Sequence, residues 1–371
     1  MNAHEAVLRA CGLARRAAGD VEPNPMVGCV LLKDGRVLAE GWHRAFGGPH
    51  AEIDALRRAG PAARGATACI SLEPCSTRGK TGPCTEVLLA AGVAHVVVGC
   101  ADPDPRHQGR GLERLLAAGV KVDLLELPEA AALLERFRAY LVARRPHVLA
   151  KWAMSRDGGI APRGGERLQL SGRQSVDLVH RWRAHLDAII VGVGTVAVDD
   201  PLLTARGPHK AVRPLRRVVL DPSLRLPMVC RLVASSHETP VWILATEDAD
   251  ARRAEALAAE GVTVFRLPRG GDAHDPAWLH AAFDLLREQG CQRVMVEGGA
   301  HTLASCLAAD VVDQVAIFIA PLELGPGALR PLGQLPEAAQ SPHEVARALR
   351  LSDCRVSRCG ADTLLRGFRG S

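Results

Sequence analysis

Two cysteines that each follow a proline restrict the N-terminal half of this chain more than any other feature. The segment "LEPCSTRGKTGPC" places Cys75 and Cys84 on either side of eight residues, mostly Gly, Ser, Thr and basic ones. "PHAE", which contains His50 and Glu52, lies 25 positions before Cys75. One histidine and two cysteines form a three-ligand set for zinc, which leaves the fourth position of the ion open to water. The sequence therefore predicts a fold that brings these residues to one point.

The cysteine usage of the whole chain argues against a disulfide between Cys75 and Cys84. The 371 residues contain eleven cysteines, an odd number, scattered over the whole length. In a reducing cytosol, paired cysteines more often bind metal or take part in chemistry than form a crosslink. We therefore predict a cytoplasmic protein. Most other cysteines are expected to be inert core residues, since Cys69 and Cys100, for example, lie in apolar segments.

Composition excludes several classes of function. The net charge is +5, from 46 basic and 41 acidic residues, without a Lys/Arg run or interleaved aromatic and basic residues. That pattern is unlike a nucleic-acid binding surface and fits a small anionic substrate better. No apolar run approaches the roughly 20 residues of a membrane span, and the N-terminus lacks the apolar core of a signal peptide. We expect no nucleic-acid partner and no membrane.

Residues 1–145 alternate between strand and helix patterns and predict a layered α/β domain. "MVGCVLLKDGRVLAEGWH" predicts a hairpin with a type I′ turn at Asp34–Gly35. Further strands are expected over 65–72, 95–100 and 121–127, and helices over 49–60, 85–92, 111–119 and 128–145. Pro146 follows the last of these helices, and we place the domain boundary there, with a second domain over 146–371.

Glu52 is the candidate for moving a proton at this site. A bound zinc ion lowers the pKa of its water from ~15.7 to about 7, so a nearby group must accept the proton that is released. Residues i and i+2 do not share a helix face, which counts against Glu52 and His50 facing one site unless His50 lies at the helix end. A closed zinc knuckle, or a buried histidine with two unrelated cysteines, remains an alternative. The His-x-Glu and Pro-Cys motifs together are the signature of zinc deaminases.

The N-terminal half resembles the deaminase domain of a bifunctional enzyme family of riboflavin biosynthesis, the RibD family. The resemblance rests on "PNPMVGCVL", "PHAEIDAL", "SLEPCSTRGKTGPC" and "DPDPRHQGRG". It implies a cytidine-deaminase-like three-layer fold and zinc-dependent hydrolytic deamination of a diaminopyrimidine that carries a ribosylamino 5-phosphate. It also implies that Asn24, His43 and Lys80 contact this substrate. The eight-residue spacer between the cysteines distinguishes the family from nucleic-acid deaminases, which usually have two residues there.

Residues 146–371 contain a motif that at first suggests a Rossmann fold. Gly192-Val-Gly194-Thr-Val-Ala197 matches the dinucleotide-binding fingerprint, and Asp221 ends a strand about 20 residues later. A Rossmann unit needs a helix between its strands, however, and 197–216 contains three prolines. We therefore reject this assignment. Other patterns predict a strand that runs from 147 into a Gly-rich loop, a helix over about 171–185, and a strand, two glycines and a helix in "VMVEGGAHTLASCL", followed by a strand in "VDQVAIFIAP".

The same segments resemble the reductase domain of that family, whose fold is like that of dihydrofolate reductase. The resemblance implies NADPH-dependent reduction of the ribosyl side chain to ribityl, and a homo-oligomer. The residues implied to face the cofactor are Ala153, Thr195, Asp199 and Gly299. Those implied to face the substrate are Lys151, Arg183, Leu203, Arg206 and Glu297.

This sequence departs from the family pattern at three positions in the second half. Arg156 stands where the family usually has Leu, and Arg167 and Gln169 stand where it has a Ser-x-Trp. The family's tryptophan would pack on the cofactor. A second interpretation therefore stays open beside the bifunctional enzyme, namely a deaminase whose C-terminal half is a structural or dimerising module.

Overall fold

The computed structural model describes residues 1–77, 82–164, 168–211, 213–268, 275–330 and 341–369. The chain divides into two compact units, Met1–Ala143 and Arg144–Ser371, which we describe separately. None of the helices within these ranges is long and apolar enough to cross a membrane. All eleven cysteines are free thiols.

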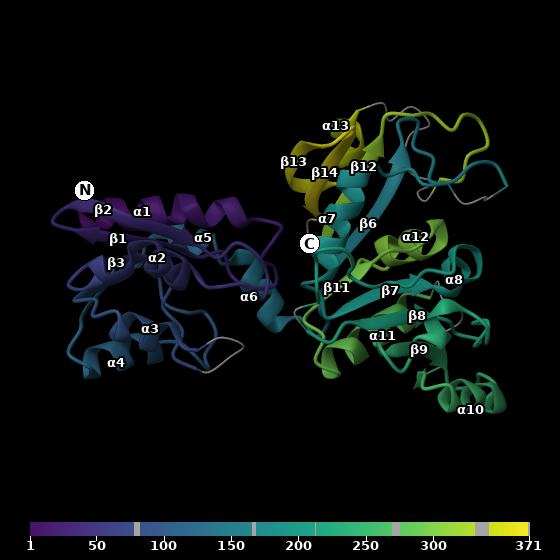
Figure 1. Ribbon diagram of the computed structural model, residues 1–371, viewed down its shortest axis with the longest axis horizontal. Helices are drawn as coiled ribbons and strands as arrows, with labels where there is room; N and C mark the ends of the chain where they lie inside the picture. The colour runs from purple at the N-terminus through teal and green to yellow at the C-terminus, as the bar shows by residue number, and fades with distance from the viewer. Residues whose placement is uncertain (78–81, 165–167, 212, 269–274, 331–340, 370–371) are drawn as a thin grey trace. The chain divides into compact units, whose positions relative to one another are not determined.

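The first unit is a five-stranded sheet with helices on both faces (Figure 1). Its strands are β1 (Gly28–Lys33), β2 (Arg36–Trp42), β3 (Thr67–Ile70), β4 (His95–Val98) and β5 (Lys121–Leu124). Its α-helices are α1 (Ala3–Ala14), α2 (Ala51–Ala59), α3 (Cys84–Ala90), α4 (Arg110–Ala117), α5 (Pro128–Ala132) and α6 (Glu135–Val142), with short 3₁₀ turns at Arg15–Ala17 and Gly60–Ala63.

The strand order β2-β1-β3-β4-β5 follows from one hairpin, β1–β2, and three crossovers, from β2 to β3, from β3 to β4 and from β4 to β5. β1 is antiparallel to β2 and β3, whereas β3, β4 and β5 are parallel. The predicted hairpin turn is confirmed, because Asp34 and Gly35 have φ of 51° and 73°, and a type I′ turn requires positive φ at both positions. Buried side chains of α1 and α5 pack on one face of the sheet, and those of α2, α3 and α4 on the other.

Two helices of the first unit differ from the sequence prediction. Residues 128–145 were expected to form one helix, but α5 ends at Ala132 and α6 begins at Glu135. Leu133 and Leu134 lie at the break and are both buried, although adjacent side chains of an α-helix point in directions about 100° apart. The break lets both leucines enter the core. The helix α1 was not predicted at all, although Asn2 and Glu5 form a capping box at its start.

The second unit is a nine-stranded sheet, again with helices on both faces. Its strands are β6 (His147–Ser155), β7 (Ala188–Gly192), β8 (Arg216–Leu220), β9 (Val241–Thr246), β10 (Thr263–Leu267), β11 (Arg293–Val296), β12 (Gln314–Ala320), β13 (Leu351–Cys359) and β14 (Asp362–Arg369). Its helices are α7 (Arg173–Arg183), α8 (Val193–Asp199), α9 (Arg231–Ala234), α10 (Ala251–Ala259), α11 (Pro276–Glu288), α12 (Ala300–Ala308) and α13 (Pro342–Ala348).

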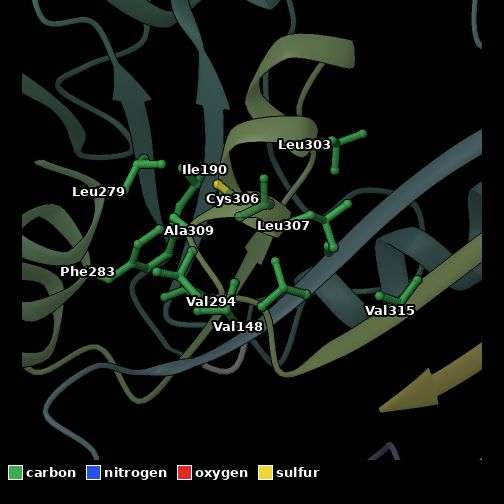
Figure 2. Close-up of a cluster of buried hydrophobic side chains, with 14 of the residues drawn as sticks. Val148, Ile190, Leu279, Phe283, Val294, Leu303, Cys306, Leu307, Ala309 and Val315 are labelled. Atoms are coloured by element: carbon green, nitrogen blue, oxygen red, sulfur yellow. The ribbon is translucent and has the colours of Figure 1, made fainter. Parts of the chain in front are cut away.

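Seven strands of this sheet are parallel and two are not. The order is β10-β9-β8-β7-β11-β6-β12-β14-β13, and only β14 and β13 run antiparallel to their neighbours. Figure 2 shows the core on one face, where α11 contributes Leu279 and Phe283 and α12 contributes Leu303 and Cys306. Residues of α7, α8, α9 and α10 cover the opposite face. The strands predicted from 147, before Asp221, in "VMVEGGAHTLASCL" and in "VDQVAIFIAP" are confirmed.

The connection between β7 and β8 differs from the expectation that no helix lies between these strands. The seven-residue helix α8 begins at Val193, inside the glycine motif, and β7 and β8 are parallel neighbours. The helix ends before Pro201, and 200–215 contains no further helix among its described residues. Gly194 lies in α8 rather than in a loop before a helix, so the motif does not form the phosphate-binding turn of a Rossmann fold.

Two glycines of the first unit give a matched test of its packing. A Cβ on Gly28 would lie 2.0 Å from the carbonyl oxygen of Ala10, whereas a Cβ on Gly12, in the last turn of α1, would have nothing within 4 Å. We expect Gly28→Ala to destabilise the protein by about 1–3 kcal/mol through overpacking. Gly12→Ala should stabilise it by about 0.5–1 kcal/mol through helix propensity. Thermal unfolding of the full chain measures both, and equal shifts in the two variants would contradict the packing.

Candidate functional site

His50, Cys75 and Cys84 lie together in the first unit. Their ligand atoms are all within 4.8 Å of one another. His50 Nδ1 lies 3.2 Å from Cys84 Sγ and 3.6 Å from Cys75 Sγ. Cys75 comes from the loop after β3, and Cys84 is the first residue of α3. The structure thus brings together the three residues that the sequence singled out.

The start of α3 holds Cys75 in place. The backbone N–H of Cys84 donates to Cys75 Sγ at 3.3 Å, and the N–H and hydroxyl of Thr85 donate to the Cys75 carbonyl at 3.2 and 3.3 Å. Hydrogen bonds from the Cys84 thiol and from His50 lower the pKa of Cys75, although burial acts in the opposite direction. Sequence reasoning did not identify Thr85 as part of this arrangement.

This donor set fits a zinc ion. One imidazole nitrogen and two sulfurs are ligands that zinc prefers, and they converge from three separate segments of the chain. Within the described ranges the group consists of these three residues only. A three-ligand group is typical of a catalytic zinc site, whereas a structural site has four protein ligands.

Glu52 is buried beside this group. It occupies the first turn of α2 and is 3% exposed, and burial raises the pKa of its carboxyl while the nearby His50 lowers it. His50 itself precedes the helix, with an extended backbone at φ −70° and ψ 163°. The argument that residues i and i+2 cannot share a helix face therefore does not apply, because His50 is not on the helix.

Asn24 and His43 lie next to the metal-ligand group. The imidazole of His43 is 5.5 Å from that of His50, centroid to centroid. Burial lowers the pKa of His43 to about 4, so its ring is neutral near pH 7. Its Nδ1 donates to the carbonyl of Pro49 at 2.9 Å, which leaves Nε2 to accept from the Asn24 amide at 3.2 Å. Lys80, the third predicted substrate contact, lies outside the described residues.

In the second unit, Lys151, Arg183 and Glu297 form a buried charged group. Arg183 donates two hydrogen bonds to the Glu297 carboxylate, at 2.6 and 2.8 Å, and Lys151 Nζ lies 3.8 Å from Glu297 Oε2. The sheet register explains the meeting, because Val296 pairs with Ala150, the residue before Lys151. Burial alone would raise the pKa of Glu297, but Arg183 and Lys151 hold it at about 2. Breaking such a buried pair by removing one partner costs about 3–5 kcal/mol.

The segment that carries Leu203 and Arg206 is attached to this charged group. Arg183 Nη1 and His180 Nδ1 both bind the carbonyl oxygen of Thr204, each at 3.1 Å. Leu203 is buried and has a φ of 51°. Partial burial and the nearby Arg183 lower the pKa of Arg206, which places the two guanidinium groups in one positive region. His180 was not found by sequence reasoning, which considered only Arg183 on this helix.

The predicted cofactor residues lie on three elements of the same unit. Gly299 precedes α12, and its N–H donates to Thr195 Oγ1 at 3.1 Å. Thr195 and Asp199 are four residues apart on α8 and therefore share a face of that helix. Ala153 follows Lys151 by two residues on β6, on the same side of the strand.

The glycines around α12 fit a bound phosphate group. A Cβ on Gly192 or Gly298 would lie 2.3 or 2.6 Å from side-chain atoms of Thr302, so the backbone approaches the helix closely. A Cβ on Gly299 would meet only Thr195 Oγ1, at 3.4 Å, and one on Gly194 would meet nothing within 4 Å. The N-terminus of a nine-residue helix thus has an approachable backbone in front of it, which suits the phosphates of a nucleotide.

Both described departures from the family pattern make a hydrogen bond, Arg156 through its backbone to a distant segment and Gln169 through its side chain to a neighbouring residue. The Arg156 N–H donates to the carbonyl of Leu322 at 2.8 Å, and the Gln169 amide donates to the carbonyl of Ser171 at 3.1 Å. Gln169 is exposed. Arg167 lies outside the described residues.

Comparisons with known proteins identify the family. Residues 146–365 match the model of the RibD C-terminal domain, and residues 1–100 match the cytidine and deoxycytidylate deaminase zinc-binding region. The chain belongs to the RibD family. It is 37% identical to riboflavin biosynthesis protein RibD of Aquifex aeolicus, over 86% of either chain. It is 36% identical to RibD of Actinobacillus pleuropneumoniae, over 96% of this chain and 93% of that protein.

Solved structures agree over the full length. RibD of Acinetobacter baumannii (form 1) has a TM-score of 0.70 at 32% identity and covers 100% of this chain and 99% of its own. The deaminase/reductase of Thermotoga maritima has a TM-score of 0.67 at 31% identity, with the same coverage. The predicted cytidine-deaminase-like and dihydrofolate-reductase-like folds are confirmed. The chain is a bifunctional deaminase and reductase of riboflavin biosynthesis, of the zinc- and NADPH-dependent kind.

Proposed function

We propose that the first unit deaminates 2,5-diamino-6-(5-phosphoribosylamino)pyrimidin-4-one and that the second reduces the ribosyl chain of the product to ribityl. One observation carries the first step, namely that His50, Cys75 and Cys84 meet within 4.8 Å beside the buried Glu52. The Thermotoga maritima structure described above is named for a deaminase and reductase acting on such phosphoribosylamino compounds.

In the deaminase site, His50, Cys75 and Cys84 would hold the zinc ion. The ion supplies an acidified water that can attack near neutral pH. Glu52 accepts a proton from this water and gives it to the amino group, which leaves as ammonia. Burial beside the three ligands suits this role, because a carboxyl with a raised pKa can both accept and return a proton.

Asn24 and His43 bind the pyrimidine in this proposal. His43 is neutral and fixed by Pro49, so it orients the Asn24 amide rather than supplying charge. Lys80 lies between the two cysteines in the sequence and would bind the phosphate.

In the reductase site, Glu297 holds Lys151 and Arg183 in place, because its carboxylate binds both cations. NADPH bound in this unit would supply the hydride for the reduction of the sugar carbon. Lys151 supplies the accompanying proton, since burial lowers the pKa of its ammonium group. Arg183, Leu203 and Arg206 bind the substrate.

The NADPH site of this proposal lies around α12. Gly299 and Thr195 bind a phosphate of the cofactor at the helix N-terminus, and Asp199 and Ala153 line the same site. The Gly192 and Gly298 positions support this assignment, because side chains there would collide with Thr302.

We further propose a homo-oligomer in the cytoplasm. Within the described residues β13 pairs only with β14, and it is largely exposed at the edge of the sheet. Such an edge can pair with a second chain. The scattered free cysteines support a reducing compartment.

The metal assignment predicts that the purified protein contains about one zinc ion per chain and that Cys75→Ser loses most of it. Ammonia release should fall with the zinc content. Cys354→Ser is the control, because Cys354 is an exposed thiol on β13. Metal analysis and ammonia release measure the outcome, and full zinc with full turnover in Cys75→Ser would refute the assignment.

The role of Glu52 predicts that Glu52→Gln keeps the zinc but slows deamination roughly 10²–10⁴-fold, because a general acid–base is lost. Asp54→Asn is the control, since Asp54 lies in the same first helical turn and binds Arg44 at the surface. NADPH oxidation on the already deaminated substrate should be unchanged in both variants. Loss of zinc from Glu52→Gln would mean that the residue is a ligand instead.

The reductase assignment predicts that the wild type oxidises NADPH with the deaminated substrate and that Lys151→Met does not. Methionine keeps most of the length of the lysine side chain but has no ammonium group to donate a proton. Ammonia release should continue at its normal rate. Lys210→Met, which removes an exposed lysine of the same unit, is the control. If the wild type releases ammonia but oxidises no NADPH, the second half is a structural module.

A further inference from the structure

The motif "DPDPRHQGRG", residues 102–111, has no role in the proposed function so far. It connects the end of β4 to the start of α4. The segment is braced internally, because Asp104 accepts hydrogen bonds from the backbone and guanidinium of Arg106, and Asp102 accepts one from the N–H of Asp104. A segment of this stiffness moves as one piece, so its position depends on how its ends are attached.

Both ends are attached to the side chain of Glu73. Its carboxylate accepts backbone hydrogen bonds from Asp102 at 3.1 Å, Gly109 at 2.9 Å and Gly111 at 2.8 Å. The backbone N–H of Glu73 also donates to the carbonyl of Cys100 at 3.0 Å. Glu73 is 5% exposed, so these bonds are not in competition with bulk water.

A charged acceptor suits this position. Gly109 and Gly111 lie at the N-terminus of α4, where unpaired N–H groups and the helix dipole favour a negative charge. Glu73 therefore acts as the cap of a helix that lies more than 30 residues later in the chain. Bonds from N–H groups to a carboxylate are about twice as strong as those between neutral groups.

Gly111 provides a second, independent attachment. A Cβ at this position would lie 2.1 Å from the carbonyl oxygen of Pro74. The start of α4 therefore touches the backbone of the residue that directly precedes Cys75. Only a glycine allows this approach without displacing one of the two segments.

The attached segment also reaches the far side of Cys75. His107 Nδ1 lies 3.4 Å from the hydroxyl of Thr77, two residues after Cys75. The segment 102–111 thus contacts the chain on both sides of this proposed zinc ligand. Cys75 itself is held separately, through the bonds from Thr85 and Cys84.

We propose that Glu73 is a positioning residue of the deaminase site, which ties the segment 102–111 to the Cys75 loop so that this segment forms a fixed wall beside Cys75. The proposal rests on the deaminase function proposed above. Because Cys75 has its own attachments, loss of the wall should weaken substrate binding and leave the metal ligands in place.

Glu73→Gln tests this role of Glu73, because glutamine has nearly the same shape as glutamate. The amide offers one acceptor oxygen instead of two and no charge, so at least one of the three N–H groups loses its partner. We expect the KM of deamination to rise about tenfold or more, the factor that a lost bond to a buried charge represents. The kcat should change much less, and zinc should stay at the wild-type level. Amide hydrogen exchange at Asp102, Gly109 and Gly111 should become faster.

Gly111→Ala is the second variant, because it disturbs the same attachment while Glu73 keeps its charge; the added Cβ would lie 2.1 Å from the Pro74 carbonyl oxygen and 3.1 Å from Glu73 Oε1. We expect it to reproduce the rise in KM. Glu86→Gln is the matched control, since Glu86 also links α3 to α4, through an exposed ion pair with Arg114 at 2.8 Å. It should leave KM, kcat and zinc content unchanged.

Three outcomes would overturn the proposal. They are an unchanged KM and exchange rate in Glu73→Gln, loss of zinc from that variant, or unprotected amides at Asp102, Gly109 and Gly111 in the wild type. Amide exchange of the wild type tests the attachment to Glu73 even if both variants fail to fold. If the wild type releases no ammonia, the deaminase function itself fails, whereas the exchange rates still report on the attachment to Glu73.

Discussion

His50 precedes the first turn of α2 with an extended backbone, and the geometry of the deaminase site follows from that position. A residue that precedes a helix does not have helical backbone angles, so its side chain is not tied to the 100° spacing of the residues within the helix. His50 can therefore face Cys75 and Cys84 while Glu52, two positions later, is buried beside the same group. Had His50 been inside the helix, the two side chains would have pointed about 160° apart around the helix axis.

The same principle of placing polar groups where an element begins or ends recurs in both units. Cys84 opens α3, Glu73 caps α4, and Gly299 opens α12. Loops and termini leave backbone N–H groups without helical partners, and these groups hold side chains or ligands in fixed positions. In the second unit the charged group is different in kind, because Arg183 and Lys151 compensate the buried Glu297 across a parallel sheet. There strand register places Lys151 and Glu297, whereas Arg183 is the last residue of α7.

Sequence reasoning failed where local and tertiary preferences disagree. The continuous pattern of 128–145 predicts one helix, but burying Leu133 and Leu134 together requires a break. The prolines after Ala197 correctly indicate that no long helix follows β7, yet the short helix α8 begins earlier, within the glycine motif. Glu73 stands beside Cys75 in the sequence, but its three partners lie about 30 to 40 residues later, so no local pattern could indicate its contacts.

The sequence by itself determined the alternation of strands and helices, the type I′ hairpin at Asp34–Gly35, and the residue types of a three-ligand metal group. These features depend on local backbone preferences and on chemistry that each side chain carries wherever it lies. Only the tertiary structure decided that His50, Cys75 and Cys84 meet at one point, and that Lys151 lies beside Glu297. These contacts join residues that are far apart in the chain. The packing of helices on the sheet and the pairing of strands bring them together, and no short stretch of sequence contains that information.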